Sequence, residues 1–175
     1  MRFAALCLSL VALKANAHEL WIEPLDYQIS VETTLKANLV NGENYEGVAL
    51  SYMPRKFSDF VMFAGAERAN VDGRIGETPA LQMQPLTDGL HIAAYISNPS
   101  TITYETWDKF QAFVDHKDLG DARSLHDARG LPTEGFKEAY RRYSKSLIAV
   151  GSGAGMDRRF GMETEIVALA NPYVG

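Results

Sequence analysis

Apolar and polar residues alternate along much of this chain, and a period of two is typical of half-buried β-strands. The longest alternation covers residues 29–39, for which we predict one strand. Residues 90–97 alternate as well, with His91 and Tyr95 on the less apolar face. Shorter apolar runs bounded by turn residues predict further strands, at residues 48–53, 60–63, 81–86, 101–105, 147–150 and 163–169.

The hydrophobic period changes to that of a helix after Thr106, which we expect to be the N-cap. Four apolar residues recur there at helical spacing, namely Trp107, Phe110, Phe113 and Val114. Pro132-Thr133 begins a second helical pattern over residues 136–143, whereas residues 115–131 have the composition of a polar connector. We therefore predict a mainly β protein, a β-sandwich with a short two-helix insertion at about residues 106–146.

The first 17 residues have the pattern of a signal peptide. Arg2 precedes an apolar run over residues 3–13, and Ala15-Asn16-Ala17 matches a small-x-small cleavage site. Neither this run nor any later one reaches the ~20 apolar residues that cross a bilayer. We therefore predict a periplasmic or secreted protein with no membrane span in its mature chain, a single sandwich domain over residues 18–175 that begins with His18.

Composition narrows the chemistry open to the mature protein. Its single cysteine, Cys7, lies in the signal peptide, so the mature chain has neither disulfides nor thiolate ligands. The formal net charge is −5, and loss of Arg2 and Lys14 with the signal peptide lowers it to −7. An acidic chain argues against nucleic acid as a partner. The sequence contains no serine-nucleophile elbow, phosphate loop or zinc-protease motif, and we predict that it is not an enzyme.

The residue that signal cleavage exposes is the strongest candidate for metal chemistry. The free α-amine of His18 and its imidazole Nδ1 close one chelate ring, and both offer a lone pair near neutral pH. His91 adds a third nitrogen, and nitrogen-rich sites suit nickel, cobalt or copper. Weaker candidate ligands are Glu19, His116 and His126. The alternatives are a frayed terminus for His18, a core or surface histidine for His91, and hydrated side chains for the rest.

A second group of charged residues lies near the end of the predicted insertion. Arg141, Arg142 and Lys145 fall close to Tyr140 and Tyr143 in the sequence. Guanidinium and ammonium groups bind anions through charged hydrogen bonds, whereas a basic helix face directed at solvent would bind nothing. The sequence leaves both interpretations open.

Four segments, taken in order, resemble one family of exported bacterial proteins. They are HELWIEP at 18–24, GLHIAAYIS at 89–97, Lys109-Phe110 leading into Asp118-Leu119, and RYSKSL at 142–147 followed by EIVALANP at 165–172. Their order and spacing are similar to the domain-of-unknown-function family 4198, whose members are often labelled periplasmic components of nickel or cobalt uptake. The resemblance implies an immunoglobulin-like or transthyretin-like sandwich, an exported location and a transition-metal role. Members usually continue past the Asn-Pro, so we expect that a downstream domain is missing here.

We therefore predict an exported accessory protein that binds nickel, cobalt or copper through His18 and His91. Its partner would be an inner-membrane metal uptake system, and it would need no organic cofactor. The alternative is a structural or protein-interaction β-sandwich module that binds no metal.

Overall fold

The computed structural model describes residues 18–174. The predicted signal peptide and its cleavage site, residues 1–17, lie outside the described residues. The described chain divides into two compact units. We call His18–Thr103 together with Lys137–Gly175 the sandwich unit, and Tyr104–Phe136 the helical unit.

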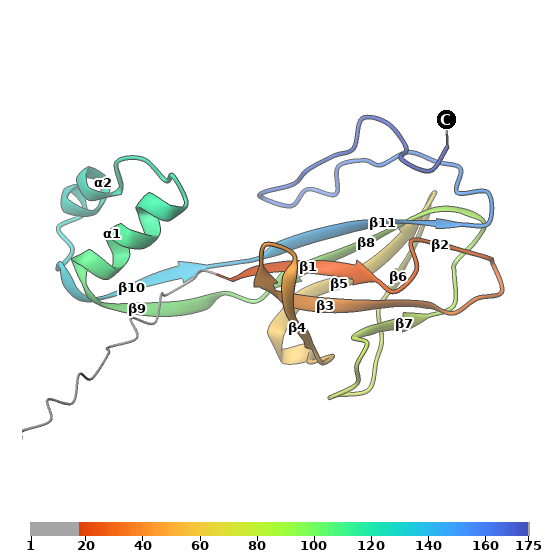
Figure 1. Cartoon of the computed structure of the whole chain (residues 1–175), viewed down its shortest axis with the longest axis horizontal. Helices are drawn as coiled ribbons and strands as arrows, with labels where there is room; N and C mark the ends of the chain where they lie inside the picture. Colours follow the sequence, from red (N-terminus) through yellow and green to blue (C-terminus); the bar gives the residue numbers. More distant parts are fainter. Residues whose placement is uncertain (1–17, 175) are drawn as a thin grey trace, which may run out of the picture. The chain divides into compact units, whose positions relative to one another are not determined.

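Within residues 18–174, two β-sheets form the sandwich unit, which confirms the predicted mainly β sandwich (Figure 1). The first sheet has the order β1-β3-β4, and β7 pairs with the beginning of β3. Its strands are β1 (Glu19–Pro24), β3 (Leu35–Glu43), β4 (Glu46–Leu50) and β7 (Leu81–Met83). The second sheet has the order β2-β11-β8-β5-β6. Its strands are β2 (Gln28–Ile29), β5 (Phe57–Ala64), β6 (Glu67–Asn70), β8 (Gly89–Ser97) and β11 (Tyr143–Val150).

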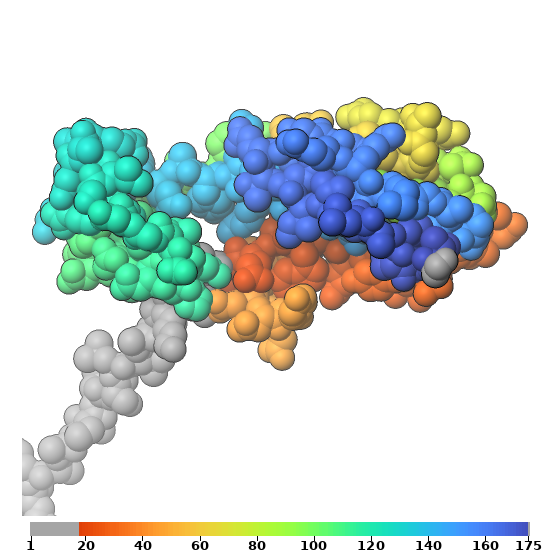
Figure 2. Space-filling model, turned by 90° about the horizontal axis from the view of Figure 1, so that it is seen from above, coloured from red at the N-terminus to blue at the C-terminus, as the bar shows by residue number. Residues whose placement is uncertain are grey.

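Strands of both sheets supply the core of the sandwich unit, whose fully buried side chains include Leu35, Met62, Leu81 and Ile148. β8 is buried along nearly its whole length. Residues 151–174, which we call the C-terminal segment, cover one face of this unit without forming a helix or strand (Figure 2). The backbone N–H of Leu90 donates to the carbonyl of Ala154 at 2.8 Å, which ties the segment to β8. β8 therefore packs on both faces.

The helical unit contains α1 (Trp107–His116) and α2 (Ala122–Ala128). In the sequence they lie between β9 (Ser100–Thr106) and β10 (Glu134–Tyr140), two strands that pair with each other. Six rings form one aromatic cluster with centroid distances from 4.6 to 6.4 Å. They belong to Tyr104, Trp107, Phe110, Phe113, His126 and Phe136. α1 begins at Trp107 as predicted, although the Thr106 side chain makes no capping hydrogen bond.

The alternating stretch at residues 29–39 is two strands rather than the single strand predicted. β2 ends at Ile29 in the second sheet, and β3 begins at Leu35 in the first. A turn separates them, in which the N–H of Thr33 donates to the carbonyl of Ser30 at 3.1 Å. Val31 is exposed in this turn, so its apolar character does not indicate a strand.

The predicted second helix at residues 136–143 is also wrong, because these residues belong to β10 and β11. In β10 the more buried positions are Phe136, Glu138 and Tyr140, which is a period of two. The second helix is α2, in the segment predicted to be a connector. It buries one residue, His126, so hydrophobic periodicity gives no signal there.

The last predicted strand, at residues 163–169, is absent, and side-chain carboxylates bind backbone N–H groups in and beside this stretch. The N–H of Ala168 donates to Oδ2 of Asp157 at 2.8 Å. Glu165 folds back and accepts from the N–H groups of Phe160 and Gly161. This part of the C-terminal segment is therefore held by carboxylates rather than by a sheet.

Candidate functional site

His91, one of the two leading metal candidates, is fully buried in β8 with both ring nitrogens engaged. The N–H of Leu86 donates to Nε2 at 3.0 Å, and Nδ1 lies 3.1 Å from the carbonyl oxygen of Gly89. Nε2 is therefore the acceptor, and Nδ1 carries the proton. Burial lowers the pKa of this imidazole, and the bond to Gly89 with the charges of Glu67 and Asp88 offsets part of that effect. In this arrangement neither nitrogen has a free lone pair for a metal.

His18, the other leading candidate, directly precedes β1 and is exposed. Its carbonyl oxygen accepts a hydrogen bond from Nη2 of Arg142 at 3.2 Å. The His18 ring has no hydrogen-bond partner among residues 18–174. Glu19, the first residue of β1, lies opposite Gly42 of β3.

The two weaker histidine candidates lie in the helical unit. His116 is the exposed last residue of α1. His126 is buried in the aromatic cluster, with its ring centroid 4.9 Å from that of Trp107 and 4.6 Å from that of Phe136. Its Nε2 lies 2.8 Å from the carbonyl oxygen of Pro132. Among residues 18–174, no group of three or more His, Cys, Asp or Glu side chains is arranged to hold a metal ion.

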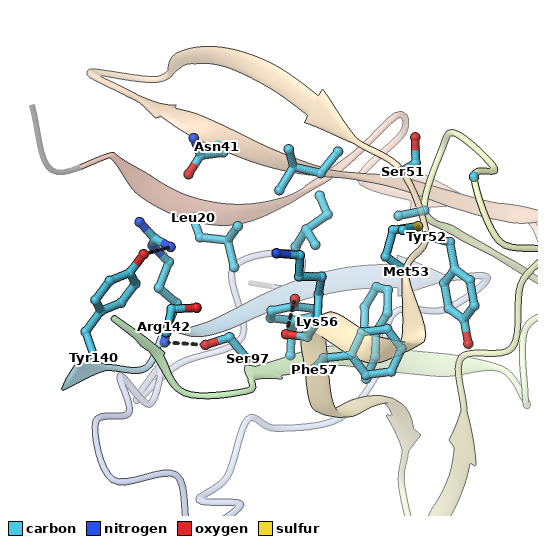
Figure 3. Close-up of a pocket in the computed structure, with 17 residues that line it drawn as sticks. Leu20, Asn41, Ser51, Tyr52, Met53, Lys56, Phe57, Ser97, Tyr140 and Arg142 are labelled. Carbon is cyan, nitrogen blue, oxygen red and sulfur yellow. Dashed lines mark hydrogen bonds between the residues drawn. The ribbon is translucent and has the colours of Figure 1, made fainter. Parts of the chain in front are cut away.

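A cavity of about 560 Å³ lies between the two sheets of the sandwich unit (Figure 3). This volume is within the range of about 300–1,000 Å³ that is common for small-molecule sites. The first sheet contributes Leu20, Leu39 and Leu50 to the lining, and four packed rings lie opposite. These are the rings of Tyr52, Phe57, Phe60 and Tyr95, with centroids 5.3–5.7 Å apart. The interior of the cavity is therefore largely apolar.

Lys56 brings a positive charge into this cavity. It is the last residue of the 3₁₀ helix η1 (Pro54–Lys56), and its carbonyl oxygen accepts from the N–H of Asn98 at 2.9 Å and the Tyr95 hydroxyl at 3.4 Å. These two bonds fix the backbone from which the side chain extends. The ammonium group points toward the middle of the cavity (Figure 3) and has no hydrogen-bond partner among the described residues.

Arg142 supplies a second positive charge at one end of the cavity (Figure 3). Its backbone is anchored to Ser97, since the Arg142 N–H donates to the serine hydroxyl at 2.8 Å and its carbonyl accepts from the serine N–H at 2.9 Å. The guanidinium lies 4.6 Å from the Tyr140 ring centroid, a cation–π contact. This stacking and the bond to the His18 carbonyl hold the charge in place.

The polar groups of the cavity are cations, hydroxyls and one amide. Ser51, Ser97 and Ser100 contribute hydroxyls and Asn41 the amide, and the described lining contains no carboxylate. Burial raises the pKa of the Tyr95 hydroxyl, and the charge of Arg142 offsets part of that rise. Tyr95 therefore stays a neutral donor at physiological pH. The arrangement suits a ligand with an apolar body and a negatively charged group.

Sequence reasoning found one of the two cations. Arg142 belongs to the basic group noted beside Tyr140, and the structure assigns it to the cavity. Lys56 follows Pro54, which interrupts the chain between two strands. The sequence did not identify it as a binding residue, because nothing in the sequence shows that this interruption lies opposite Leu20. A cavity between two sheets depends on long-range pairing, which residue spacing does not encode.

Comparison with known proteins gives a family. The model of the family described as a domain of unknown function, DUF4198, matches residues 15–175. No curated protein and no solved structure matches the chain at the significance threshold. In the described part of the chain, neither helix has the length and apolar character that a membrane crossing requires.

Proposed function

Because the chain belongs to DUF4198, a family of unknown function, we propose its function from the cavity itself: the domain is a binding module for an organic anion with an apolar body. The observation that carries the proposal is the pairing of Lys56 and Arg142 around an apolar cavity without a lining carboxylate. The protein would act as a carrier or sensor rather than as an enzyme, in the exported location that the predicted signal peptide implies.

The chemistry of the cavity supports this class of ligand over a neutral or cationic one. Lys56 is exposed and Arg142 is half-buried, and both can form charged hydrogen bonds to an anionic group at the cavity. An apolar body gains by leaving water for the space between Leu39, Phe57 and Phe60. A cationic ligand would meet two like charges there.

Calorimetric titration with decanesulfonate tests the proposal, with decyltrimethylammonium as the ligand of equal chain length and opposite charge. We expect saturable binding of the sulfonate and none of the ammonium. Lys56→Met should weaken sulfonate binding about 10-fold, the effect of losing one charged hydrogen bond. Arg55→Gln is the matched control, because Arg55 is the neighbouring cation outside the lining and its loss should leave affinity unchanged.

Equal affinity for the two ligands would contradict the proposal, since binding would then follow chain length alone. An unchanged sulfonate affinity in Lys56→Met would contradict it too. The ratio of affinities between the two head groups separates a charge-selective site from nonspecific apolar adsorption.

Transition-metal binding is the second candidate, and the exposed ring of His18 favours it. If processing follows Ala17, the new α-amine and this imidazole form a two-nitrogen chelate without help from His91. Three features work against a larger site: the two engaged nitrogens of His91, the nearby Arg142 charge and the lack of a ligand cluster in the described chain. The proposed partner would be an inner-membrane nickel, cobalt or copper uptake system.

Titration of nickel, cobalt and copper into two forms of the protein tests this second candidate. One form begins at His18, and the other carries Gly-Ala ahead of it. We expect the native terminus to bind copper at least about 10-fold more tightly, because the extension removes the amine from its chelate ring. Equal affinities would rule out a terminal chelate.

A further inference from the structure

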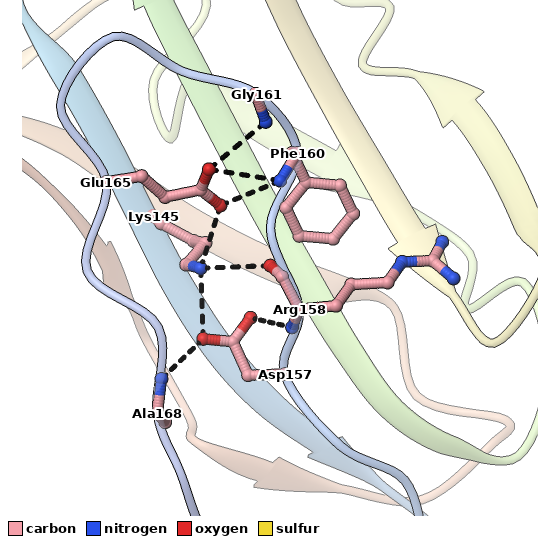
Figure 4. Close-up of polar contacts among 7 residues, drawn as sticks. All are labelled: Lys145, Asp157, Arg158, Phe160, Gly161, Glu165 and Ala168. Atoms are coloured by element: carbon pink, nitrogen blue, oxygen red, sulfur yellow. Dashed lines mark hydrogen bonds and ion pairs between the residues drawn. The ribbon is translucent and has the colours of Figure 1, made fainter.

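A lysine of β11 and two carboxylates of the C-terminal segment are buried together where the segment packs on the strand (Figure 4). Nζ of Lys145, on β11, lies 3.0 Å from Oδ2 of Asp157 and 3.1 Å from Oε1 of Glu165. The three side chains are 9%, 2% and 4% exposed, respectively. Charged groups this deeply buried are costly, because the loss of hydration opposes their attraction.

An aromatic pair lies on one side of the three groups and a cavity on another. The Phe160 ring lies with its centroid 5.5 Å from Nζ of Lys145 and stacks on Phe63 at 4.1 Å. A second cavity of about 400 Å³, whose lining includes Trp21 and Met162 as well as all three charged residues, adjoins the group.

The two carboxylates have different hydrogen-bond partners. Oδ1 of Asp157 accepts from the N–H of Arg158 at 2.7 Å, and Oδ2 faces both Lys145 and the N–H of Ala168. Glu165 accepts from Phe160 on both oxygens and from Gly161. Burial raises the pKa of Glu165, but the bonds from these amides and from Lys145 outweigh it and leave the pKa below its ordinary value. Glu165 is therefore ionised at neutral pH, and its Oε1, 3.1 Å from Nζ of Lys145, is placed to accept a proton from it.

From this geometry we propose that Lys145 and Asp157 condense into an intramolecular isopeptide bond, with Glu165 as the proton-transfer group. Glu165 takes a proton from the Lys145 ammonium, and the neutral Nζ attacks Cγ of Asp157. The N–H of Arg158 stabilises the charge that develops on Oδ1. Two protons, one carried by Glu165 and one from Nζ, then leave with Oδ2 as water. An ammonium and a carboxylate become one amide and one water, and Glu165 ends as it began.

Two physical effects favour this reaction here, although it is unfavourable between free groups in water. The fold holds nucleophile and carboxyl in contact, and such positioning is equivalent to an effective concentration of about 10⁵ M or more. Condensation also replaces the buried Lys145–Asp157 ion pair by a neutral amide, which removes the desolvation cost of those two charges. Glu165 loses Lys145 as its cation and keeps the N–H groups of Phe160 and Gly161 as partners. The adjoining cavity gives the released water a place to leave the reacting atoms.

Intact-mass spectrometry of the purified protein tests the proposal. We expect the wild-type chain to be lighter than its calculated mass by one water, and Lys145→Arg to have its full calculated mass. Both proteins undergo the same N-terminal processing, so their mass difference does not depend on where the chain begins. Glu165→Gln should also keep its full mass, because the amide cannot take a proton from Lys145. Proteolysis and tandem mass spectrometry should yield a branched peptide that joins Lys145 to Asp157.

A wild-type chain with its full calculated mass would overturn the proposal, and this result needs no variant to fold. A loss of water that persists in Lys145→Arg would also overturn it, because the dehydration would then lie elsewhere. Neither result bears on anion binding, since none of the three charged residues lines the larger cavity.

Discussion

At the scale of one residue, His91 was predicted to bind a metal, and the structure places it in the core. The sequence places it correctly on β8, but the alternation of polar and apolar positions does not show that its side of the strand, shared with Ala93 and Tyr95, packs into the core between the two sheets. Its two hydrogen bonds, from Leu86 and to Gly89, require a neutral ring with the proton on Nδ1. Protonation would put a hydrogen on Nε2, so that two donors would face each other and the hydrogen bond from Leu86 would be lost.

This requirement predicts a pH dependence of stability. Burial lowers the pKa of His91 in the folded protein, while the unfolded chain keeps the ordinary value near 6.5. As the pH falls below that value, the unfolded state binds a proton that the folded state does not bind. The free energy of unfolding therefore decreases, by at most about 1.4 kcal/mol per pH unit. Between pH 7.5 and 5.5 the wild type should lose stability, and His91→Gln should lose less.

Chemical denaturation of both proteins at pH 7.5, 6.5 and 5.5 measures the two slopes. His18→Gln is the control, because the exposed His18 ring makes no hydrogen bond within residues 18–174 and its replacement should keep the wild-type slope. Parallel curves for the wild type and His91→Gln would show that another group causes the pH dependence.

At the scale of elements, hydrophobic periodicity predicted the strands and helices that bury one apolar face or a continuous run of apolar residues. β8 (Gly89–Ser97) and α1 (Trp107–His116) lie where the pattern placed them. Periodicity failed where side chains determine the backbone path. α2 depends on Asp121, whose Oδ1 accepts from the N–H of Ser124 at 3.0 Å, and it buries too little apolar surface to leave a pattern.

The candidate cavity was harder to predict because its parts come from distant elements. Leu20 of β1, Lys56 of η1 and Arg142 beside β11 meet only after both sheets have formed. The sequence marked Arg142 as an anion-binding candidate, and left open whether it faces solvent. The position of Arg142 is fixed by the two hydrogen bonds that its backbone makes to the hydroxyl and the N–H of Ser97, 45 residues away. Local spacing carries no information about such a pairing.

At the scale of the whole molecule, the two units have separate packing. Every residue of the sandwich core lies in His18–Thr103 or Lys137–Gly175, as does every residue that lines the two cavities. The helical unit has its own aromatic cluster, within Tyr104–Phe136. A unit with its own core can fold alone.

This separation predicts that the sandwich unit survives without the helical unit. We expect a chain in which a short Gly-Ser linker replaces residues 104–136 to fold and to melt within about 5 °C of the full chain's sandwich transition, because no residue of its core has been removed. It should also bind decanesulfonate with an affinity within about 3-fold of the full chain's, a free-energy difference below about 1 kcal/mol. Calorimetry measures both quantities.

Phe136→Ala in the full chain is the matched perturbation: it should weaken the aromatic cluster and leave the sandwich transition and the sulfonate affinity unchanged. If the shortened chain fails to fold, or if Phe136→Ala lowers the sandwich transition, the two units share their stability and the division by packing is wrong.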